Sequence, residues 1–526
     1  MKILPAPLIR QADAYTIEHE PIAGIDLMER AATACAGWLC TSITPGRKVM
    51  IFCGTGNNGG DGLAIARLLF LRGYEVEAHV MKPAGKLSED FRNNFERLFE
   101  CRNSGMQECR NADNTGNSMV RGWIRVGEIA GVEDFPVISL QDVVIDALFG
   151  SGLTRPPEGL AADIIAHVNA SGAMVVAIDL PSGLFCDEHT PDVKKSAVIR
   201  ANYTLTFTPP KIALFFPENG KFTGEWVLLD IGLMQEFIDN TAVRNFMVEM
   251  NDARVMLKKR NKFSHKGTFG HALLICGSTG KMGAAVLAAR GCLRAGPGLV
   301  TVSVPRSGAT ILQTAVPEAM LVTGEDQDLF TAVPALGKYS SIAIGPGIGT
   351  APETASALKI LIQETGIPLI LDADAINLIA ENKTWLGFLP PGSVFTPHPL
   401  EFERLAGKSS DDFERNRMQR EFSYKFQCYV VLKGAHTAIT TPDGRCFFNT
   451  TGNPGMATGG SGDVLTGIIA GLRAQGYSSL ESCLLGVYLH GLAGDCASTE
   501  LGFEAMIADD IVDNLGKSFL QLYGKL

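Results

Sequence analysis

The stretch VMIFCGTGNNGGDGLAIARLL, residues 49–69, joins an apolar run to a glycine-rich turn and then to an apolar helical segment. A second apolar run follows at 75–81, so the order strand, turn, helix, strand is predicted. This order opens a doubly wound α/β sheet. Helices are predicted at 63–72 and from about 10 to 42. Three further strands of the same sheet are predicted at 142–146, 173–178 and 203–207.

A second glycine-rich stretch, GMATGGSGDVLTG at residues 455–467, also precedes an apolar helical segment. Its own α/β series has strands predicted at 272–276, 299–304, 341–344, 368–371 and 429–432. Between 232 and 262 strand signals lapse and charged residues gather, which indicates a linker. We therefore predict two doubly wound three-layer α/β domains, at residues 1–238 and 239–526. The segment from about 101 to 135 has no predicted element and begins with a polar surface excursion at 101–117.

The composition is that of a globular protein, with 526 residues, 46% hydrophobic, 19% charged and a formal net charge of −10. Nucleic acids and anionic membranes bind basic surfaces, so the acidic balance argues against both as partners. Cys53 and Cys276 lie in apolar runs and are predicted to be reduced core thiols. The start of the chain resembles neither a signal peptide nor a membrane span, so a cytoplasmic location is expected. We also expect a homo-oligomer that acts on small molecules.

The turn at 54–59 has the Gly-x-Gly-x-x-Gly spacing of dinucleotide-binding loops, which by itself also suits a hydride-transferring dehydrogenase. Its polarity is unusual, because Asn57, Asn58 and Asp61 crowd a turn that normally leaves the backbone bare. Amide and carboxylate oxygens are hard ligands that suit an alkali or alkaline-earth cation. The structural alternative is that the asparagines cap the turn and Asp146 caps a helix.

Acidic residues follow two of the predicted strands, Asp146 in DALFGSG and Asp179 in DLPSG. The carboxyl ends of parallel strands form the edge where such folds bind ligands. Asp146, Asp179 and Ser182 are therefore expected near the glycine-rich turn. Together with NNGGDG at 57–62 and LMERA at 27–31, these motifs resemble the NAD(P)H-hydrate epimerase family.

This resemblance implies a Rossmann-like domain that interconverts the R and S epimers of hydrated NADH or NADPH. It implies that the hydrated cofactor is held by Asn57, Asn58, Gly59, Gly60, Asp61, Gly150, Ser151, Gly152, Leu153, Thr154, Arg155, Pro156 and Asp179. It also implies a potassium ion held by Asn58, Asp146 and Ser182. Epimerising a carbon that bears a hydroxyl needs proton or hydroxyl transfer, so Asp179 is the preferred acid/base group and Lys211 a weaker helper.

The C-terminal turn predicts different chemistry. Successive backbone N–H groups at 458–463 would surround an anion, and Asp463 could accept a hydroxyl proton during phosphoryl transfer. The structural alternative is that Asp463 only caps the helix. A Walker loop is absent, because GSTGKM at 277–282 lacks the spacing and the Ser or Thr after lysine. Asp372 and Asp374 follow a predicted strand and could hold magnesium directly or through water.

Further motifs surround this turn: KGAHT at 433–437, GPGIG at 345–349 and His398 between two prolines. With HKGTFG at 265–270 and NPGMA at 453–457, they resemble the ribokinase-like ADP/ATP-dependent NAD(P)H-hydrate dehydratase family. This resemblance implies that Ala284, Gly347, His398 and Asp463 contact the hydrated cofactor. It implies that Lys433, Gly434, Ala435, His436, Thr437 and Gly462 contact the adenine nucleotide.

Taken together, the two resemblances imply a bifunctional repair enzyme for hydrated NAD(P)H. The first domain would epimerise the substrate with potassium, and the second would dehydrate the S epimer with magnesium and ADP, giving AMP and phosphate. Asp463 would be the base of the second step. The rivals are a ribokinase-like vitamin or sugar kinase with a non-catalytic ligand-binding N-terminal module, and a dehydrogenase.

Overall fold

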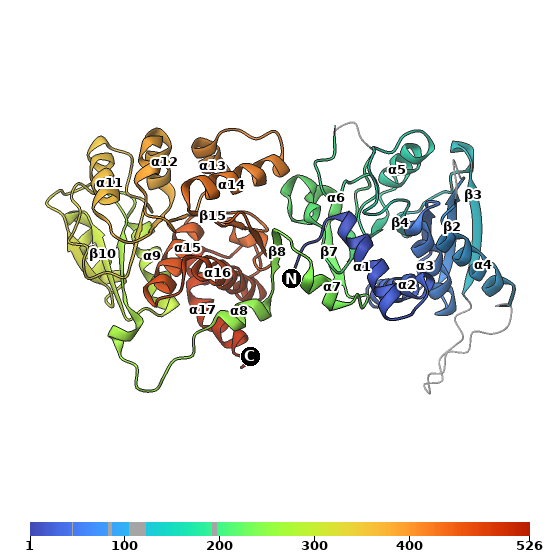
Figure 1. The fold of residues 1–526 in the computed structure, drawn as a ribbon, viewed down its shortest axis with the longest axis horizontal. Coiled ribbons are helices and arrows are strands. Elements are labelled where there is room, and N and C mark those ends of the chain that lie inside the picture. Colours follow the sequence, from blue (N-terminus) through green and yellow to red (C-terminus); the bar gives the residue numbers. More distant parts are fainter. Residues whose placement is uncertain (45, 83–86, 105–121, 192–196, 526) are drawn as a thin grey trace. The chain divides into compact units, whose positions relative to one another are not determined.

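The computed structural model describes residues 1–44, 46–82, 87–104, 122–191 and 197–525. The chain divides into two compact units, Lys2–Val243 and Arg244–Leu526, with Met1 belonging to the second. Each unit is an α/β structure with helices on both faces of one sheet (Figure 1). The predicted fold class, two three-layer α/β domains, is confirmed.

The N-terminal unit contains a seven-stranded parallel sheet in the order β3-β2-β1-β4-β5-β6-β7. The strands are β1 (Val49–Cys53), β2 (Glu75–Met81), β3 (Trp123–Ile129), β4 (Val143–Ala147), β5 (Met174–Ile178), β6 (Tyr203–Phe207) and β7 (Glu225–Leu229). The strand order reverses between β1 and β4, so the loops that follow these two strands diverge. In doubly wound folds this switch point is where ligands bind.

The helices of this unit lie on two faces of its sheet. Their bounds are α1 (Ala6–His19), α2 (Gly24–Ser42), α3 (Asn57–Leu71), α4 (Glu89–Ser104), α5 (Leu160–Ala170), α6 (Gly220–Thr223) and α7 (Gln235–Asn240). Successive residues of a strand point to opposite faces, and β1 shows this directly. Ile51 packs into the core formed with α2 and α3, whereas Met50 and Phe52 pack into the core formed with α5.

The C-terminal unit contains a ten-stranded sheet in the order β11-β10-β9-β12-β13-β14-β15-β16-β17-β8. The strands are β8 (Asn245–Val248), β9 (His271–Ile275), β10 (Leu299–Val304), β11 (Met320–Thr323), β12 (Ser341–Ile344), β13 (Leu369–Leu371), β14 (Val394–Phe395), β15 (Tyr429–Leu432), β16 (Ala438–Thr440) and β17 (Cys446–Asn449). In this order, the seven neighbouring strands from β11 to β15, which include β10 and β9, pair in parallel. Strand β16 pairs antiparallel with both β15 and β17.

The helices of the C-terminal unit are α8 (Met250–Met256), α9 (Met282–Ala295), α10 (Ala309–Ala315), α11 (Pro352–Glu364), α12 (Ala373–Glu381), α13 (Pro399–Ala406), α14 (Asp412–Phe426), α15 (Ser461–Ala474), α16 (Ser479–Leu501) and α17 (Ala508–Leu522). Helices α9, α15, α16 and α17 share one core, and α11 to α14 share the core on the opposite face of the sheet. Cys276 after β9 and Cys53 of β1 are buried thiols, as predicted.

Several sequence predictions of local structure are wrong. The helix expected from about 10 to 42 is two helices, α1 and α2, separated around Pro21, which has no N–H group for a continuous helix. Helix α3 begins at Asn57 rather than at residue 63, so the polar turn forms the first helical turn. A strand, β8, occupies part of the segment at 232–262 that was expected to lack strands, and β3 occupies part of 101–135. The predicted excursion at 101–117 is helical through Ser104, and its remainder lies outside the described residues.

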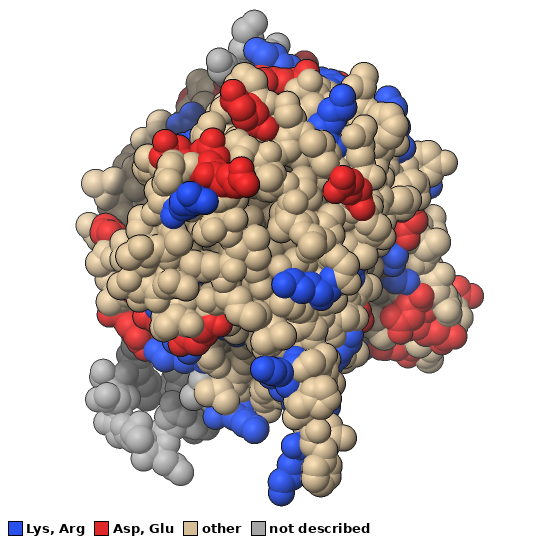
Figure 2. Space-filling view, turned by 90° about the vertical axis from the view of Figure 1, so that its left-hand side faces the viewer, with Lys and Arg blue, Asp and Glu red and all other residues tan. Residues whose placement is uncertain are grey.

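The charge distribution on the surface and the character of the helices concern the expectations about nucleic acids and membranes as partners. Figure 2 shows a face of the molecule on which described basic and acidic side chains are scattered between broad uncharged areas, without one continuous basic patch. No helix in the described ranges combines the length and apolar character needed to cross a bilayer.

Candidate functional sites

A cavity of about 640 Å³ lies in the N-terminal unit, at the carboxyl ends of its strands. It is walled by α1 and α2, by the turn after β1 and by the loops after β4, β5 and β6. The cavity brings together these predicted residues: Asn57, Asn58, Asp61, Gly150, Ser151, Gly152, Leu153, Thr154, Arg155, Asp179 and Lys211. Gly59, Gly60 and Pro156 do not line it, and neither do Asp146 and Ser182.

The glycines at the start of α3 allow backbones to approach one another closely. A Cβ atom on Gly59 would lie 1.9 Å from the carbonyl oxygen of Gly54, and one on Gly54 would lie 2.0 Å from the carbonyl oxygen of Leu148. No side chain fits at such separations. These two glycines therefore seat α3 against the loop after β4, and that packing places Asn57 and Asn58 at the cavity.

Asp146 and Ser182 form a tightly bonded pair at the ends of β4 and β5. The Ser182 hydroxyl donates to Asp146 Oδ1 over 2.6 Å, and the Ser182 N–H donates to Asp146 Oδ2 over 2.8 Å. Burial raises the pKa of Asp146 to about 6, even though these hydrogen bonds favour its ionised form. The serine hydroxyl also accepts a 2.8 Å hydrogen bond from the N–H of Phe149, which fixes the loop after β4.

The three residues predicted to hold a cation all carry side-chain oxygens. Asp146 supplies a buried carboxylate, Ser182 a hydroxyl and Asn58 an amide, and oxygen ligands of these kinds suit hard cations. The Asn58 Nδ2 atom is buried and has no hydrogen-bond partner among the described residues. Because buried polar atoms are normally satisfied and Nδ2 is a hydrogen-bond donor, this nitrogen is left for an acceptor atom of a ligand.

Asp179 lies in the strained, left-handed region of backbone conformation, with a φ of +68°. Its Oδ1 atom pairs with the Lys211 ammonium at 2.7 Å, and its Oδ2 atom accepts the Ser151 N–H at 2.8 Å. Burial opposes its ionisation, but Lys211 and Ser151 outweigh burial and hold the pKa of Asp179 below its usual value. Lys211 is only 1% exposed and also donates to the carbonyl of Phe207. The result is an ionised carboxylate aimed at the cavity.

Two further carboxyl groups in the cavity have raised pKa values, in contrast to Asp179. Burial, followed by the charges of Asp179, Asp13 and Asp90, raises the pKa of Asp61 well above its usual range. Burial also raises the pKa of Asp13 to about 6. Sequence reasoning missed Asp13, which belongs to α1 and to no recognisable motif; only the folding of α1 over the cavity shows its place.

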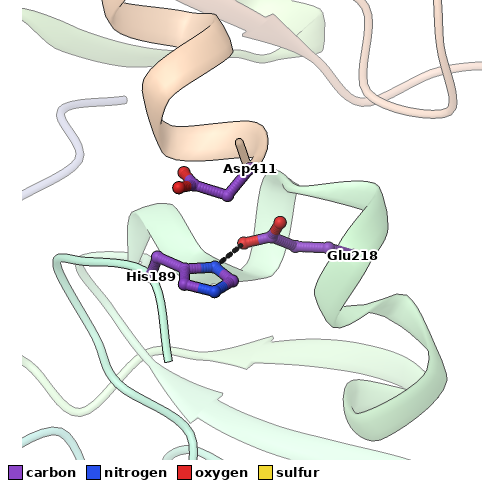
Figure 3. Close-up of side chains that lie close together, drawn as sticks. All are labelled: His189, Glu218 and Asp411. Atoms are coloured by element: carbon purple, nitrogen blue, oxygen red, sulfur yellow. Dashed lines mark hydrogen bonds and ion pairs between the residues drawn. The ribbon is translucent and has the colours of Figure 1, made fainter. Parts of the chain in front are cut away.

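One other titratable pair of the N-terminal unit lies apart from this cavity. The Nδ1 N–H of His189 donates to Glu218 Oε1 over 2.9 Å (Figure 3). Neither residue lines the cavity. We therefore assign the pair no part in the site.

The second site surrounds Asp372, which follows β13 in the C-terminal unit. Its Oδ1 atom accepts from the Lys433 ammonium at 3.0 Å, and its Oδ2 atom accepts from the Thr466 hydroxyl at 2.7 Å. Asp374 accepts from the Gly349 N–H at 2.8 Å and from Lys281 at 3.3 Å. The predicted pair of acids is thus tied to three neighbouring loops and to helix α15. Thr466 and Lys281 carried no sequence signal that singled them out.

Asp463 is the third residue of α15, where the helix N-terminus is electrostatically positive. Burial raises its pKa to about 7, with a further rise from Asp372 and an opposing effect from Lys433. Such a carboxylate is poised to exchange a proton near neutral pH. The neighbouring Gly462 would place a Cβ atom 3.3 Å from the Lys433 ammonium, so the glycine turn and this lysine lie side by side.

Lys433 and His398 lie around the same carboxylates. Lys433 is 3.9 Å from Glu401 Oε2, and although burial disfavours its charge, Asp372 and Glu401 raise the pKa of Lys433. His398 caps α13, with its Nδ1 atom accepting the N–H groups of Leu400 and Glu401. The Nε2 atom of that ring must then carry the proton, and it lies 3.4 Å from Glu401 Oε1.

The remaining predicted residues are grouped near this centre or engaged by the fold. A Cβ atom on Gly347 would lie 3.1 Å from the Ala284 Cβ, so these two residues are neighbours. Gly434 donates to the Thr437 hydroxyl, which closes the 433–437 turn. His436 Nδ1 lies 3.1 Å from the carbonyl of Asn449, and burial lowers the pKa of this histidine.

A clamp on α16 holds the segment that leads into the glycine turn. Asp495 accepts from the Gly452 N–H at 2.9 Å and from the Asn453 side chain at 3.0 Å. The Asn453 side chain in turn accepts from the Gly455 N–H. This network fixes the NPGMA segment that the sequence marked.

Comparison with known proteins adds independent information. The family model described as NAD(P)H-hydrate dehydratase matches residues 272–517, and that described as YjeF-related protein N-terminus matches residues 24–213. The bifunctional NAD(P)H-hydrate repair enzyme of Moorella thermoacetica is 34% identical, over 98% of this chain and 96% of its own. The Escherichia coli enzyme of the same name is 32% identical, over 96% of this chain and 92% of its own.

A crystal structure of the ADP/ATP-dependent NAD(P)H-hydrate dehydratase of Bacillus subtilis, co-crystallised with ATP and Mg²⁺, is also similar. It is 30% identical, with a TM-score of 0.47, and the match covers 53% of this chain and 100% of that one.

Proposed function

Because the chain belongs to the family of bifunctional NAD(P)H-hydrate repair enzymes, we propose that it restores hydrated NADH and NADPH in two steps. The N-terminal unit interconverts the R and S epimers, and the C-terminal unit dehydrates the S epimer with ADP. One observation carries the proposal: each unit gathers carboxylates and a lysine near a glycine-rich helix start. Asp179 is paired with the buried Lys211, and Asp463 lies near Lys433, which pairs with Asp372. Acid/base chemistry beside an anion site is what both steps need.

In the epimerase step, the turn at 57–61 and the loop at 150–156 hold the hydrated cofactor, and Asp179 is the acid/base group for the proton or hydroxyl transfer at the hydroxyl-bearing carbon of the cofactor. Lys211 keeps this carboxylate ionised, and the Ser151 N–H orients it. Asn58, Asp146 and Ser182 would hold a potassium ion, which supplies positive charge to the phosphate groups of the bound cofactor. The bonded Asp146–Ser182 pair supports this assignment because it presents oxygens without rearrangement.

In the dehydratase step, Asp463 takes the proton of the substrate hydroxyl while that oxygen attacks the β-phosphorus of ADP, and AMP leaves. The phosphorylated oxygen then leaves as phosphate, and loss of a proton from the adjacent ring carbon restores the double bond. Backbone N–H groups at 460–463 and the Lys433 ammonium stabilise the charge on the transferred group. Asp372 and Asp374 would hold magnesium, which offsets the negative charge of the nucleotide.

The remaining residues are proposed to recognise the two ligands. Ala284, Gly347 and His398 contact the hydrated cofactor, and residues 433–437 with Gly462 contact the adenine nucleotide. The donor character of His398 Nε2 supports its role, because the ring can offer a hydrogen to an acceptor atom of the cofactor. Homo-oligomerisation stays a prediction. Size-exclusion chromatography with light scattering, which gives the mass of the protein in solution, tests it.

The test gives the purified chain a mixture of both epimers of hydrated NADH, with ADP or ATP. Complete conversion with ADP, followed by the return of near-ultraviolet absorbance, supports both steps. Conversion that stops when the S epimer is used up shows that the epimerase assignment is wrong. A stable phosphorylated product, without regained absorbance, supports the kinase alternative instead.

A further inference from the structure

Asp13 is a carboxyl group of the epimerase cavity that the steps above do not use. It projects from α1, whereas Asp179 follows β5, so the two acids reach the same cavity from different elements. The charges of Asp179 and Lys211 both act on Asp13, which places the three groups within electrostatic reach of one another. Two carboxyl groups in one cavity can act as separate proton donor and proton acceptor.

The two carboxyl groups differ in their bonding. Both oxygens of Asp179 are engaged, by Lys211 and by Ser151. No hydrogen bond to the Asp13 side chain occurs among the residues that the structure describes, so its oxygens face the cavity without a partner. A structural aspartate on a helix normally caps a helix end or pairs with a base. Asp13, in the middle of α1, does neither.

The ionisation of the two groups is also pushed in opposite directions. Burial and the neighbouring Asp179 raise the pKa of Asp13 to about 6 against the opposing charge of Lys211, whereas Lys211 lowers the pKa of Asp179. The other charged residues that line the cavity are Arg10, Asp61, Asp90 and Arg155. Two neighbouring acids whose pKa values are pushed apart are the usual sign of a donor and an acceptor.

We propose that Asp13 is a second catalytic carboxyl group of the epimerase site, which protonates the departing hydroxyl while Asp179 receives a proton from the returning water. The inference rests on the proposed epimerase function and names the group that completes it. No sequence motif singles out Asp13; its place on the cavity wall does.

In the proposed step, water leaves carbon six of the ring and then adds again to its other face. Asp13 transfers its proton to the hydroxyl oxygen on ring carbon six, the carbon–oxygen bond breaks, and the ring-nitrogen lone pair forms a carbon–nitrogen double bond as water leaves. Water then adds to the other face of that carbon, the double-bond electrons return to nitrogen, and the added water gives a proton to Asp179. Asp13 ends ionised and Asp179 protonated, and the reverse conversion uses them in exchanged roles. Solvent restores the starting states.

The test compares Asp13→Asn with Glu18→Gln, a matched change on the exposed side of the same helix. In the full chain, Asp13→Asn should slow conversion of the R epimer at least about 100-fold with little change in KM. ADP-dependent dehydration of the S epimer should be unchanged, which shows that the C-terminal unit is intact, and the circular dichroism and thermal unfolding of the variant chain are compared with wild type to check the N-terminal unit. Glu18→Gln should leave both rates alone. R-epimer conversion within about threefold of wild type in Asp13→Asn overturns the proposal.

A second measurement keeps the proposal testable if Asp13→Asn disturbs the unit. The wild-type rate for the R epimer should fall as pH rises above about 6, because the donor loses its proton. Epimerisation in ¹⁸O-labelled water should label the carbon-six oxygen faster than the uncatalysed exchange. Absence of that label, or a flat limb above pH 6, contradicts the proposal. A wild-type chain that never converts the R epimer contradicts the proposed function itself.

Discussion

Replacement of Lys211 by methionine tests how the fold keeps a buried carboxylate ionised. The change removes the ammonium 2.7 Å from Asp179 and a hydrogen bond to the carbonyl of Phe207. Removing one partner of a buried ion pair typically costs about 3–5 kcal/mol, because an uncompensated charge stays behind. Asp179 can escape that cost by taking up a proton.

Protonation of Asp179 limits how much stability the Lys211→Met variant can lose, and this limit depends on pH. Protonating a carboxyl group of ordinary pKa costs about 1.36 kcal/mol per pH unit above about 3.9, which is about 4 kcal/mol at pH 7 and about 1.5 kcal/mol at pH 5. In the wild type the pKa of Asp179 is lowered, so its stabilising effect is fully present throughout this range and is lost only at lower pH. In the variant the pKa is raised, so stability falls as pH rises.

The assay is hydrogen exchange of the β5 and β6 amides in the full chain, corrected for intrinsic exchange rates. We expect the free energy of opening to fall by about 2–3 kcal/mol more at pH 7 than at pH 5. Lys221→Met, which removes an exposed lysine of the same unit, is the control and should show no such dependence. Equal losses at both pH values would refute the reasoning, because the cost would then come from packing alone.

Three further outcomes are expected. Asp463→Asn should lower the ADP-dependent dehydration rate, measured by the near-ultraviolet absorbance, by about 100- to 10,000-fold, while the R and S epimers still interconvert. The wild-type dehydration rate should fall as pH drops below about 7, because Asp463 then becomes protonated. Gly59→Ala should lower the free energy of unfolding of the N-terminal unit by about 2–3 kcal/mol in a denaturant titration, whereas Gly56→Ala, with no atom within 4 Å of the added carbon, should not. Replacing potassium with tetramethylammonium should slow epimer interconversion, followed by chromatography, and leave the epimerase fold intact; an unchanged rate would contradict the assignment of Asn58, Asp146 and Ser182.

The sequence was most informative where a segment is buried on both sides. The run at 49–53 is apolar throughout because β1 is covered on both faces, so its assignment needed no tertiary information. Strand β3 is only half buried, and its mixed residues lack both the apolar run and a strict alternation. Such a segment becomes a strand because β2 pairs with it, and that partner is not visible locally.

The sites divide in the same way. The glycine turn with Asp463 and the strand-end acid Asp179 carry local signals, so both could be singled out from the sequence. Asp13 and Thr466 lie inside ordinary helices and join the sites only when those helices pack. The ionisation of Asp179 likewise depends on Lys211, which is 32 residues away in sequence and adjacent in space.

The Asn58 Nδ2 atom, which has no hydrogen-bond partner among the described residues, links the stability of the folded protein to ligand binding. A buried polar group without a partner destabilises the empty enzyme, and a bound ligand that satisfies it stabilises the folded form by mass action. Degradation in cells commonly follows the population of opened molecules. The folded protein should therefore resist opening and degradation better when its ligand is bound than when the site is empty.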